Sequence, residues 1–136
     1  MEDKIEVREY VRTKDGIIAQ IKNIDYEAEI YRFDRTIYIN DFGMKNDVLY
    51  NNEMFKKVVV KHSKQLKDLI ESGDFVNGYQ VYLEEGELAY ELSEHMPPYE
   101  FIKNIKIETV LTHQQFEANC YKVATSRRRR WALNQK

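Results

Sequence analysis

The residues best suited to chemistry are five glutamates that lie close together, Glu84, Glu85, Glu87, Glu91 and Glu94. Paired carboxylates can serve as general acid and base when one is buried in an apolar pocket and the other stays ionised. With a bound metal ion, such carboxylates can also support hydrolysis. These glutamates fall on a predicted hairpin whose side chains face water, so a solvated acidic face is favoured over acid–base catalysis. A metal-dependent nuclease or hydrolase stays open as an alternative.

The three histidines and the single cysteine give no recognisable site. His62, His95 and His113 are far apart, and none has a second histidine or cysteine at helical or hairpin spacing, as metal ligation would require. We expect surface or capping roles for them. Cys120 is most simply a buried small residue. A nucleophilic role would need a histidine beside it, and His113 lies about two helical turns upstream. The sequence therefore predicts no catalytic residue, no metal and no cofactor.

Charge is distributed very unevenly along the chain, although the net charge is only −2. Residues 1–67 carry 13 basic and 12 acidic groups, residues 68–102 carry nine acidic groups and no Lys or Arg, and residues 103–136 carry eight basic and two acidic groups. An acidic block repels nucleic acid and attracts basic grooves. Interleaved with aromatic anchors such as Tyr82 and Tyr90, it could imitate the charge spacing of a nucleic-acid strand. The alternative is an acidic face that only keeps the protein soluble.

The C-terminal segment has the opposite character. Arginines pair bidentately with phosphates, and tryptophan can stack on a base. The chain could therefore bind nucleic acid through this segment, with the contacts made by Arg127, Arg128, Arg129, Arg130, Trp131 and nearby Lys122. The alternative is a flexible basic tail, residues 125–136, that has little to bury.

The elements that would position these residues are mostly short β-strands. Alternating apolar residues predict strands over 7–13, 17–21, 26–33, 36–39, 54–60, 74–76, 79–83, 88–92 and 101–111, with a loop over 40–53. Tight turns are predicted at 14–16 and 84–87, and Asn77-Gly78 marks either a turn or a bulge. Helices are predicted over 64–72 and 113–119, the second opened by Thr112 with Phe116 facing inward. We expect one β-rich α+β domain over residues 1–124, folded as a small bent antiparallel barrel that is SH3-like in part.

The composition also limits where the protein is expected to act. No run of about 18 apolar residues is present, and the N-terminus is charged, which argues against a membrane span and a secretory signal. One cysteine excludes a disulfide framework and fits a reducing cytoplasm. We therefore expect a cytoplasmic monomer or homodimer without membrane contact.

Three segments resemble a family of small proteins carried by prophages and other mobile elements of Gram-positive bacteria. The first segment is Val11-Arg-Thr-Lys-Asp-Gly16, and the third runs from Ile105 to Glu117. The second runs from Val60 to Val81 and contains Lys-His-Ser-Lys at 61–64 and Gly-Asp-Phe-Val-Asn-Gly-Tyr at 73–79. The resemblance covers roughly residues 7–123. This chain departs from the family in an insertion near 41–53 and in its arginine-rich tail.

The resemblance implies a context and no catalytic or binding residues. Small non-enzymatic phage proteins often inhibit host defence, and anti-CRISPR proteins that block nucleic-acid enzymes with acidic surfaces are among them. The resemblance thus implies an inhibitor of a host nucleic-acid-directed defence effector, a Cas effector or similar protein with a basic groove, inside the host bacterium. The acidic block, and not the resemblance, supplies the expected contacts of such an inhibitor: Glu84, Glu85, Glu87, Glu91 and Glu94, with Tyr82 and Tyr90 as anchors.

Overall fold

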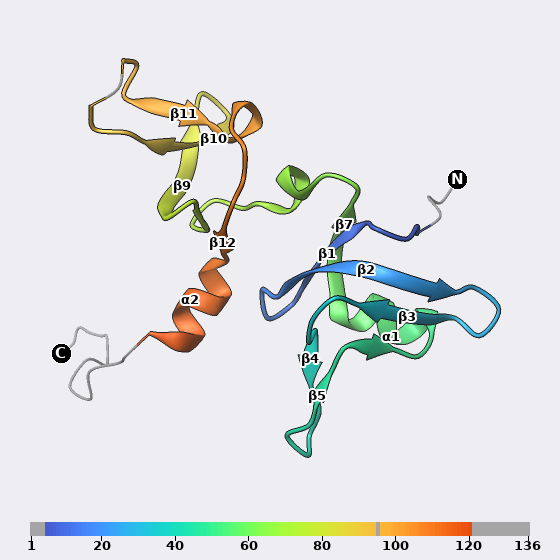
Figure 1. Cartoon of the computed structure of the whole chain (residues 1–136). Coiled ribbons are helices and arrows are strands. Elements are labelled where there is room, and N and C mark those ends of the chain that lie inside the picture. The colour runs from blue at the N-terminus through green and yellow to red at the C-terminus, as the bar shows by residue number, and fades with distance from the viewer. Residues whose placement is uncertain (1–4, 95, 121–136) are drawn as a thin grey trace, which may run out of the picture.

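The computed structural model describes residues 5–94 and 96–120, and it places two antiparallel sheets at opposite ends of an elongated molecule (Figure 1). The first lobe, residues 5–63, has a sheet in the order β6-β3-β2-β1-β7, and the second lobe, residues 70–111, has a sheet in the order β11-β10-β9-β8-β12. The strands of the first sheet are β1 (Tyr10–Thr13), β2 (Ile18–Asp25), β3 (Ile30–Phe33), β6 (Val48–Leu49) and β7 (Val59–Ser63). Those of the second are β8 (Phe75–Val76), β9 (Tyr79–Glu84), β10 (Glu87–Glu91), β11 (Tyr99–Phe101) and β12 (Val110–Leu111).

Each lobe has its own apolar core. In the first lobe the core includes Val11, Ile21, Phe33 and Leu49, all almost fully buried. In the second lobe a smaller core is built from Ile70, Val76, Val81, Tyr90 and Ile102. The α+β class is confirmed, but the predicted barrel is wrong: both sheets are open, because their first and last strands pair on one side only.

The insertion near 41–53 is more ordered than predicted. The chain there forms the hairpin of β4 (Tyr38–Ile39) and β5 (Lys45–Asn46), then β6, and then α1 (Asn52–Val58). The strand predicted over 54–60 is therefore wrong up to Val58, where α1 ends and β7 follows. The helix forms because the Asn51 side chain accepts the Met54 N–H at 2.7 Å, and because Phe55 and Val58 then face the first core together.

Two tight hairpins shape the second lobe. Asn77-Gly78 (φ 53° and 89°) joins β8 to β9, and Glu85-Gly86 (φ 55° and 81°) joins β9 to β10. Positive φ at both central residues is the conformation that two-residue hairpins require. Asn77-Gly78 is thus a turn and not a bulge, and the predicted turn at 84–87 is confirmed.

The segment 101–111 does not form the single predicted strand. It consists of the end of β11, a 3₁₀ turn η2 (Ile102–Asn104), an irregular stretch and β12. The Asn77 side chain holds this stretch: its Oδ1 accepts the N–H groups of Glu108 (2.7 Å) and Thr109 (3.1 Å), and its Nδ2 donates to the Lys106 carbonyl. These bonds replace the ladder that a continuous strand would make.

Three further expectations are settled by the structure. The strand predicted over 26–33 begins only at Ile30, because residues 26–29 turn and the Asp25 side chain accepts the Ala28 N–H. The helix predicted over 64–72 is one 3₁₀ turn, η1 (Leu66–Leu69). The helix α2 (His113–Asn119) is confirmed together with its Thr112 cap, but Phe116 is 46% exposed and not turned inward; its ring lies 5.0 Å from that of Phe75.

Candidate functional site

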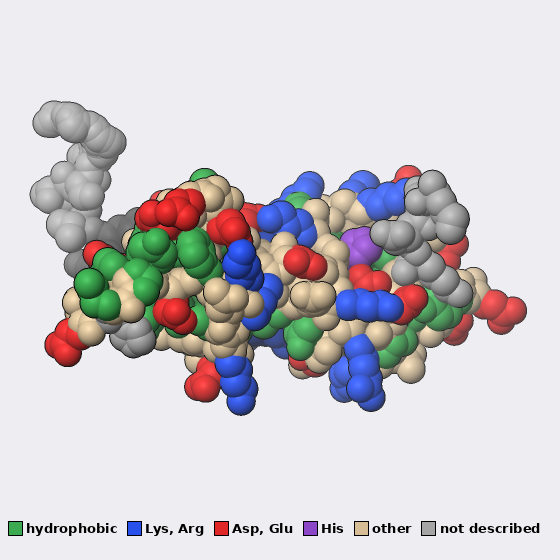
Figure 2. Space-filling model, turned by 90° about the horizontal axis from the view of Figure 1, so that it is seen from above, with side chains coloured by type: hydrophobic (Ala, Val, Ile, Leu, Met, Phe, Trp, Pro, Cys, Tyr) green, Lys and Arg blue, Asp and Glu red, His purple; other side chains and the backbone are tan. Residues whose placement is uncertain are grey.

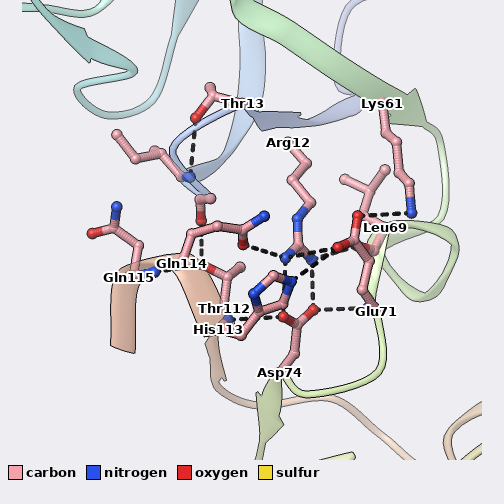
Figure 3. Close-up of polar contacts among 12 residues, drawn as sticks. Arg12, Thr13, Lys61, Leu69, Glu71, Asp74, Thr112, His113, Gln114 and Gln115 are labelled. Carbon is pink, nitrogen blue, oxygen red and sulfur yellow. Dashed lines mark hydrogen bonds and ion pairs between the residues drawn. The ribbon is translucent and has the colours of Figure 1, made fainter. Parts of the chain in front are cut away.

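Two groups of residues stand out. The first lies between the lobes around the buried pair of Arg12 and Asp74 and is here called the junction (Arg12, Lys61, Glu71, Asp74, His113 and Gln114; Figure 3). Arg12 leaves β1 with a side chain that is 0% exposed. Its two terminal nitrogens donate to Asp74 Oδ2 (2.5 Å) and Oδ1 (2.9 Å) in a bidentate pair. The same nitrogens donate to the Leu69 carbonyl (2.8 Å) and to Gln114 Oε1 (2.6 Å). One guanidinium thus ties β1, the end of η1, the start of β8 and the first turn of α2 together.

The carboxylates of the junction are held ionised. Burial by itself would raise the pKa of Asp74, but hydrogen bonds from Arg12 and from the backbone N–H groups of Glu71 and His113 lower it below its ordinary value. Burial likewise opposes ionisation of Glu71, yet contacts from Lys61 and His113 and the charge of Arg12 lower its pKa. Neither group is therefore poised to donate a proton near neutral pH.

The N-terminus of α2 is fixed to the first lobe beside this cluster. Thr112 Oγ1 donates to the Gly16 carbonyl at 2.6 Å, and Gln115 Nε2 donates to the Asp15 carbonyl at 2.7 Å. Gly16 has φ +82°, and a Cβ there would lie 2.4 Å from Thr112 Oγ1. Glycine is therefore required for this close approach.

Residues from three separate segments of the chain meet at the junction. Arg12 and Gly16, Asp74, and Thr112 link the lobes through the bonds above, whereas the side chain of Asn77 bonds only within the second lobe. Both terminal nitrogens of Arg12 and both carboxylate oxygens of Asp74 are hydrogen-bonded, to one another, to the backbone and to Gln114, whereas Arg12 Nε is buried without a hydrogen-bond partner. The arrangement links the two lobes.

The second group lies on the solvent-facing side of the second sheet, here called the outer face (Tyr82, Glu84, Glu87, Glu91, Tyr99 and Phe101). Residues directly opposite one another in antiparallel strands share a face. The register pairs Glu84 with Glu87, Tyr82 with Ala89, Ala89 with Phe101, and Glu91 with Tyr99. Three carboxylates and three aromatic rings are thus brought to the same side, opposite the face that carries Val81 and Tyr90.

The aromatic side chains of the outer face close over its centre. Ala89 is 0% exposed although it points to this side, because its neighbours on both flanks are Tyr82 and Phe101. The rings of Tyr99 and Phe101 meet edge to face with centroids 5.4 Å apart. Desolvation, then the charges of Glu84 and Glu91 and the nearby Tyr99, raise the pKa of Tyr82, so its hydroxyl stays protonated and can donate.

One lysine shows how this surface accommodates a cation. Lys103 Nζ lies 5.6 Å from the Phe101 ring centroid and 2.8 and 2.9 Å from the two oxygens of Glu87. No such ion pair involves Glu84 or Glu91 among residues 5–94 and 96–120. Figure 2 shows hydrophobic and acidic side chains gathered over the end of the molecule that carries β9–β11, with most of the Lys and Arg on the other half of this view.

The structure brings some of the predicted contact residues together and separates others. Tyr82, Glu84, Glu87 and Glu91 share the outer face, and Glu85 and Glu94 are exposed at its two ends. Tyr90 does not belong with them: it is 6% exposed and its ring stacks on Tyr79 at 4.7 Å on the core side. Since β10 alternates, Glu91 and Tyr90 must face opposite ways.

Two aromatic residues of the outer face were not predicted as contacts. Tyr99 and Phe101 come from β11, which the sequence places partly in a proline loop. The spacing of two aromatics around Glu100 is the period of a strand, and that signal could have identified them.

The remaining candidates take other positions. His62 Nδ1 lies 2.7 Å from Glu9 Oε1, and His113 Nε2 lies 3.1 Å from Glu71 Oε1. Cys120 is exposed, so the expectation of a buried cysteine is wrong, because α2 ends there without packing against a core. His95, Lys122, Arg127–Arg130 and Trp131 lie outside the described residues, as does the whole of the proposed tail.

Within the described ranges, no three His, Cys, Asp or Glu side chains converge as they would around a metal ion. None of the described helices is both long and apolar enough to cross a bilayer.

No family model, curated protein or solved structure matches the chain. The function of the chain is therefore inferred from its own geometry.

Proposed function

We propose that this protein is a non-enzymatic binding protein whose outer face occupies a basic, nucleic-acid-binding groove of another protein. The observation that carries the proposal is the shared face itself: three carboxylates and three aromatic rings on one sheet surface, within a stretch that contains no Lys or Arg from 68 to 102. Carboxylates form ion pairs with arginine and lysine, and the faces of aromatic rings bind the same side chains through cation–π interactions.

The chemistry of the outer face favours a protein partner over nucleic acid. A surface of this sign repels phosphates and steers positively charged surfaces toward it. The partner class we propose is a host defence effector directed at nucleic acid, such as a Cas effector, with the chain acting in the bacterial cytoplasm as an anti-CRISPR-type inhibitor. The support for this narrower class is the phage-family resemblance together with the sign and shape of the outer face.

The experiment that tests the proposal compares two charge-reversed variants. The test variant is Glu84→Lys/Glu87→Lys/Glu91→Lys, and the control, which reverses three exposed charges of the first lobe, is Glu27→Lys/Asp47→Lys/Glu53→Lys. Each immobilised protein is incubated with nuclease-treated lysate of a Gram-positive host, and retained proteins are eluted with rising salt and, separately, with double-stranded DNA.

We expect the wild type and the control to retain the same nucleic-acid-binding protein, displaced by both salt and DNA, and the test variant to lose it. Retention of the same protein by the test variant would overturn the proposal. A partner that double-stranded DNA fails to displace would also overturn the proposal, because DNA and this protein would compete for the same nucleic-acid-binding groove.

A further inference from the structure

A second exposed feature lies on the first lobe, at the tip of the β4–β5 hairpin (Asn40–Met44, here called the tip). Phe42 is 89% exposed, and its neighbours Met44 and Ile39 are 63% and 59% exposed. Three large apolar side chains within six residues are unusual for a surface that contacts only water. The hairpin projects away from both sheets (Figure 1).

The tip is held in one conformation. Asn40 Oδ1 accepts the N–H groups of Phe42 (2.9 Å) and Met44 (3.0 Å), and the Asn40 backbone bonds to Met44 and Gly43. At the base, Ile37 is fully buried in the first core and Tyr38 packs against that core. A rigid loop loses little conformational entropy when it binds, so Phe42 is preorganised as an anchor.

A hollow of about 600 Å³ opens beside the same hairpin, between it and α2. Its lining combines the apolar Ile17, Ile39 and Ala118 with the charged Lys14, Asp15 and Glu117 and with further polar residues of α2. This volume falls within the roughly 300–1,000 Å³ of typical ligand pockets, and it exceeds that of one phenyl ring. Ile39 belongs both to the hairpin and to the lining of the hollow, so the hollow begins at the base of the tip that carries Phe42.

We propose that two copies of this chain form a closed, two-fold symmetric dimer in which Phe42 of each copy seats in the hollow of the other. A two-fold interface must be self-complementary, with one patch carrying both the projecting and the receiving part. A two-fold axis near Ile39 satisfies this, because it exchanges the tip and the hollow of the two copies.

The charges agree with the same pairing. Asp41 lies on the tip and Lys45 directly follows it, and the charged residues Lys14, Asp15 and Glu117 line the hollow. Seating the tip in the hollow of the second copy brings Asp41 toward Lys14 and Lys45 toward Asp15, so each pair is of opposite sign. The dimer leaves the outer face of each copy, on the other lobe, open to its own partner.

Sedimentation velocity of the full chain over a wide concentration range tests the dimer. We expect a concentration-dependent monomer–dimer equilibrium for the wild type. Phe42→Ser and Ala118→Arg should both be monomeric, because one removes the anchor and the other fills the hollow. Met96→Ser is the matched control, since Met96 is 92% exposed but lies on the second lobe, and it should dimerise as the wild type does.

A charge exchange tests the pairing itself. Lys14→Asp alone should weaken the dimer, and Lys14→Asp/Asp41→Lys should restore it. A wild type that is monomeric at every concentration, one that forms open-ended oligomers, or a Phe42→Ser variant that still dimerises would overturn the proposal. Because the substituted side chains are exposed, the circular dichroism spectrum of each variant should match that of the wild type, which separates loss of the interface from loss of the fold.

Discussion

The junction and the outer face contain the same kinds of charged residue in opposite settings. At the junction, Asp74 is 0% exposed and is matched by Arg12 and two backbone N–H groups. On the outer face, Glu84 and Glu91 have no ion pair among the described residues and sit beside aromatic rings. Carboxylates that are paired inside a protein fix its structure, whereas carboxylates left unpaired on a surface are available to a partner.

The two regions also differ in the sign of their contribution to stability. Removing one member of a buried ion pair leaves an uncompensated charge and strongly destabilises the fold. Like charges placed opposite each other on a sheet surface, as Glu84 and Glu87 are, destabilise it mildly while they are present. The contrast predicts that the same type of change, removal of a charge, lowers stability at the junction and raises it on the outer face.

The largest effect is expected for Arg12→Met. This change leaves Asp74 and Glu71 without their buried cation and should reduce the free energy of unfolding by about 3–5 kcal/mol. The change in the free energy of unfolding is measured by urea denaturation followed by far-ultraviolet circular dichroism. Arg32→Met, on an exposed position of β3, is the control and should change stability by less than about 0.5 kcal/mol. Equal losses in both variants would contradict a structural role specific to the junction.

The next effect is expected for Gly16→Ala. The added Cβ would lie 2.4 Å from Thr112 Oγ1 and 2.7 Å from Gln114 Cβ, and Gly16 has φ +82°. We expect a loss of about 1–3 kcal/mol, since strained backbone and displacement of α2 both contribute.

Gly43→Ala separates these two causes. Gly43 has nearly the same φ, +79°, but no atom within 4 Å of the added Cβ. The stability lost in Gly43→Ala should therefore reflect backbone strain alone. If Gly16→Ala lost no more stability than Gly43→Ala, the contact with α2 would contribute nothing to the loss.

The sequence predicted the two regions unequally, and the reason is physical. Local signals identified what local bonds decide: Thr112 caps α2, and Glu85-Gly86 turns between β9 and β10. The acidic face was also predicted, since charge sign needs no knowledge of the fold. Tyr90 was assigned to the wrong side because strand register decides which residues face the core.

The junction could not be predicted in the same way. Arg12 and Asp74 are 62 residues apart, and neither position shows locally that it is buried. Helix α1 was missed for a related reason. The β-branched residues at 58–60 favour a strand, but the Asn51 cap and the packing of Phe55 against the core make the residues before them helical. Contacts distant in sequence determine both features.

Acid should destabilise the fold through the carboxylates of the junction. The pKa values of Asp74 and Glu71 lie below their ordinary values of about 3.9 and 4.3. Their contribution to stability is therefore present above those ordinary values and is lost as the pH falls through the lowered values. We expect thermal stability to fall steeply below about pH 4 in the wild type. Arg12→Met should lose this dependence, because protonation then relieves an unpaired buried Asp74, and an unchanged acid transition in that variant would contradict the assignment.

The smallest effect is expected on the outer face, where it has the opposite sign. Glu84→Gln keeps the size of the side chain and removes its repulsion with Glu87, so the free energy of unfolding should rise by a few tenths of a kcal/mol, and by at most about 1. Urea denaturation at low and high salt measures it: salt should stabilise the wild type more than the variant, since it screens the repulsion that the variant lacks. Glu27→Gln, an exposed glutamate of the first lobe, should show neither effect. If Glu84→Gln were destabilising, the Glu84 carboxylate would help to hold the fold together, as the carboxylates of the junction do. If the variant instead gained stability and lost partner binding, the outer face would keep its charge for binding at a cost in stability.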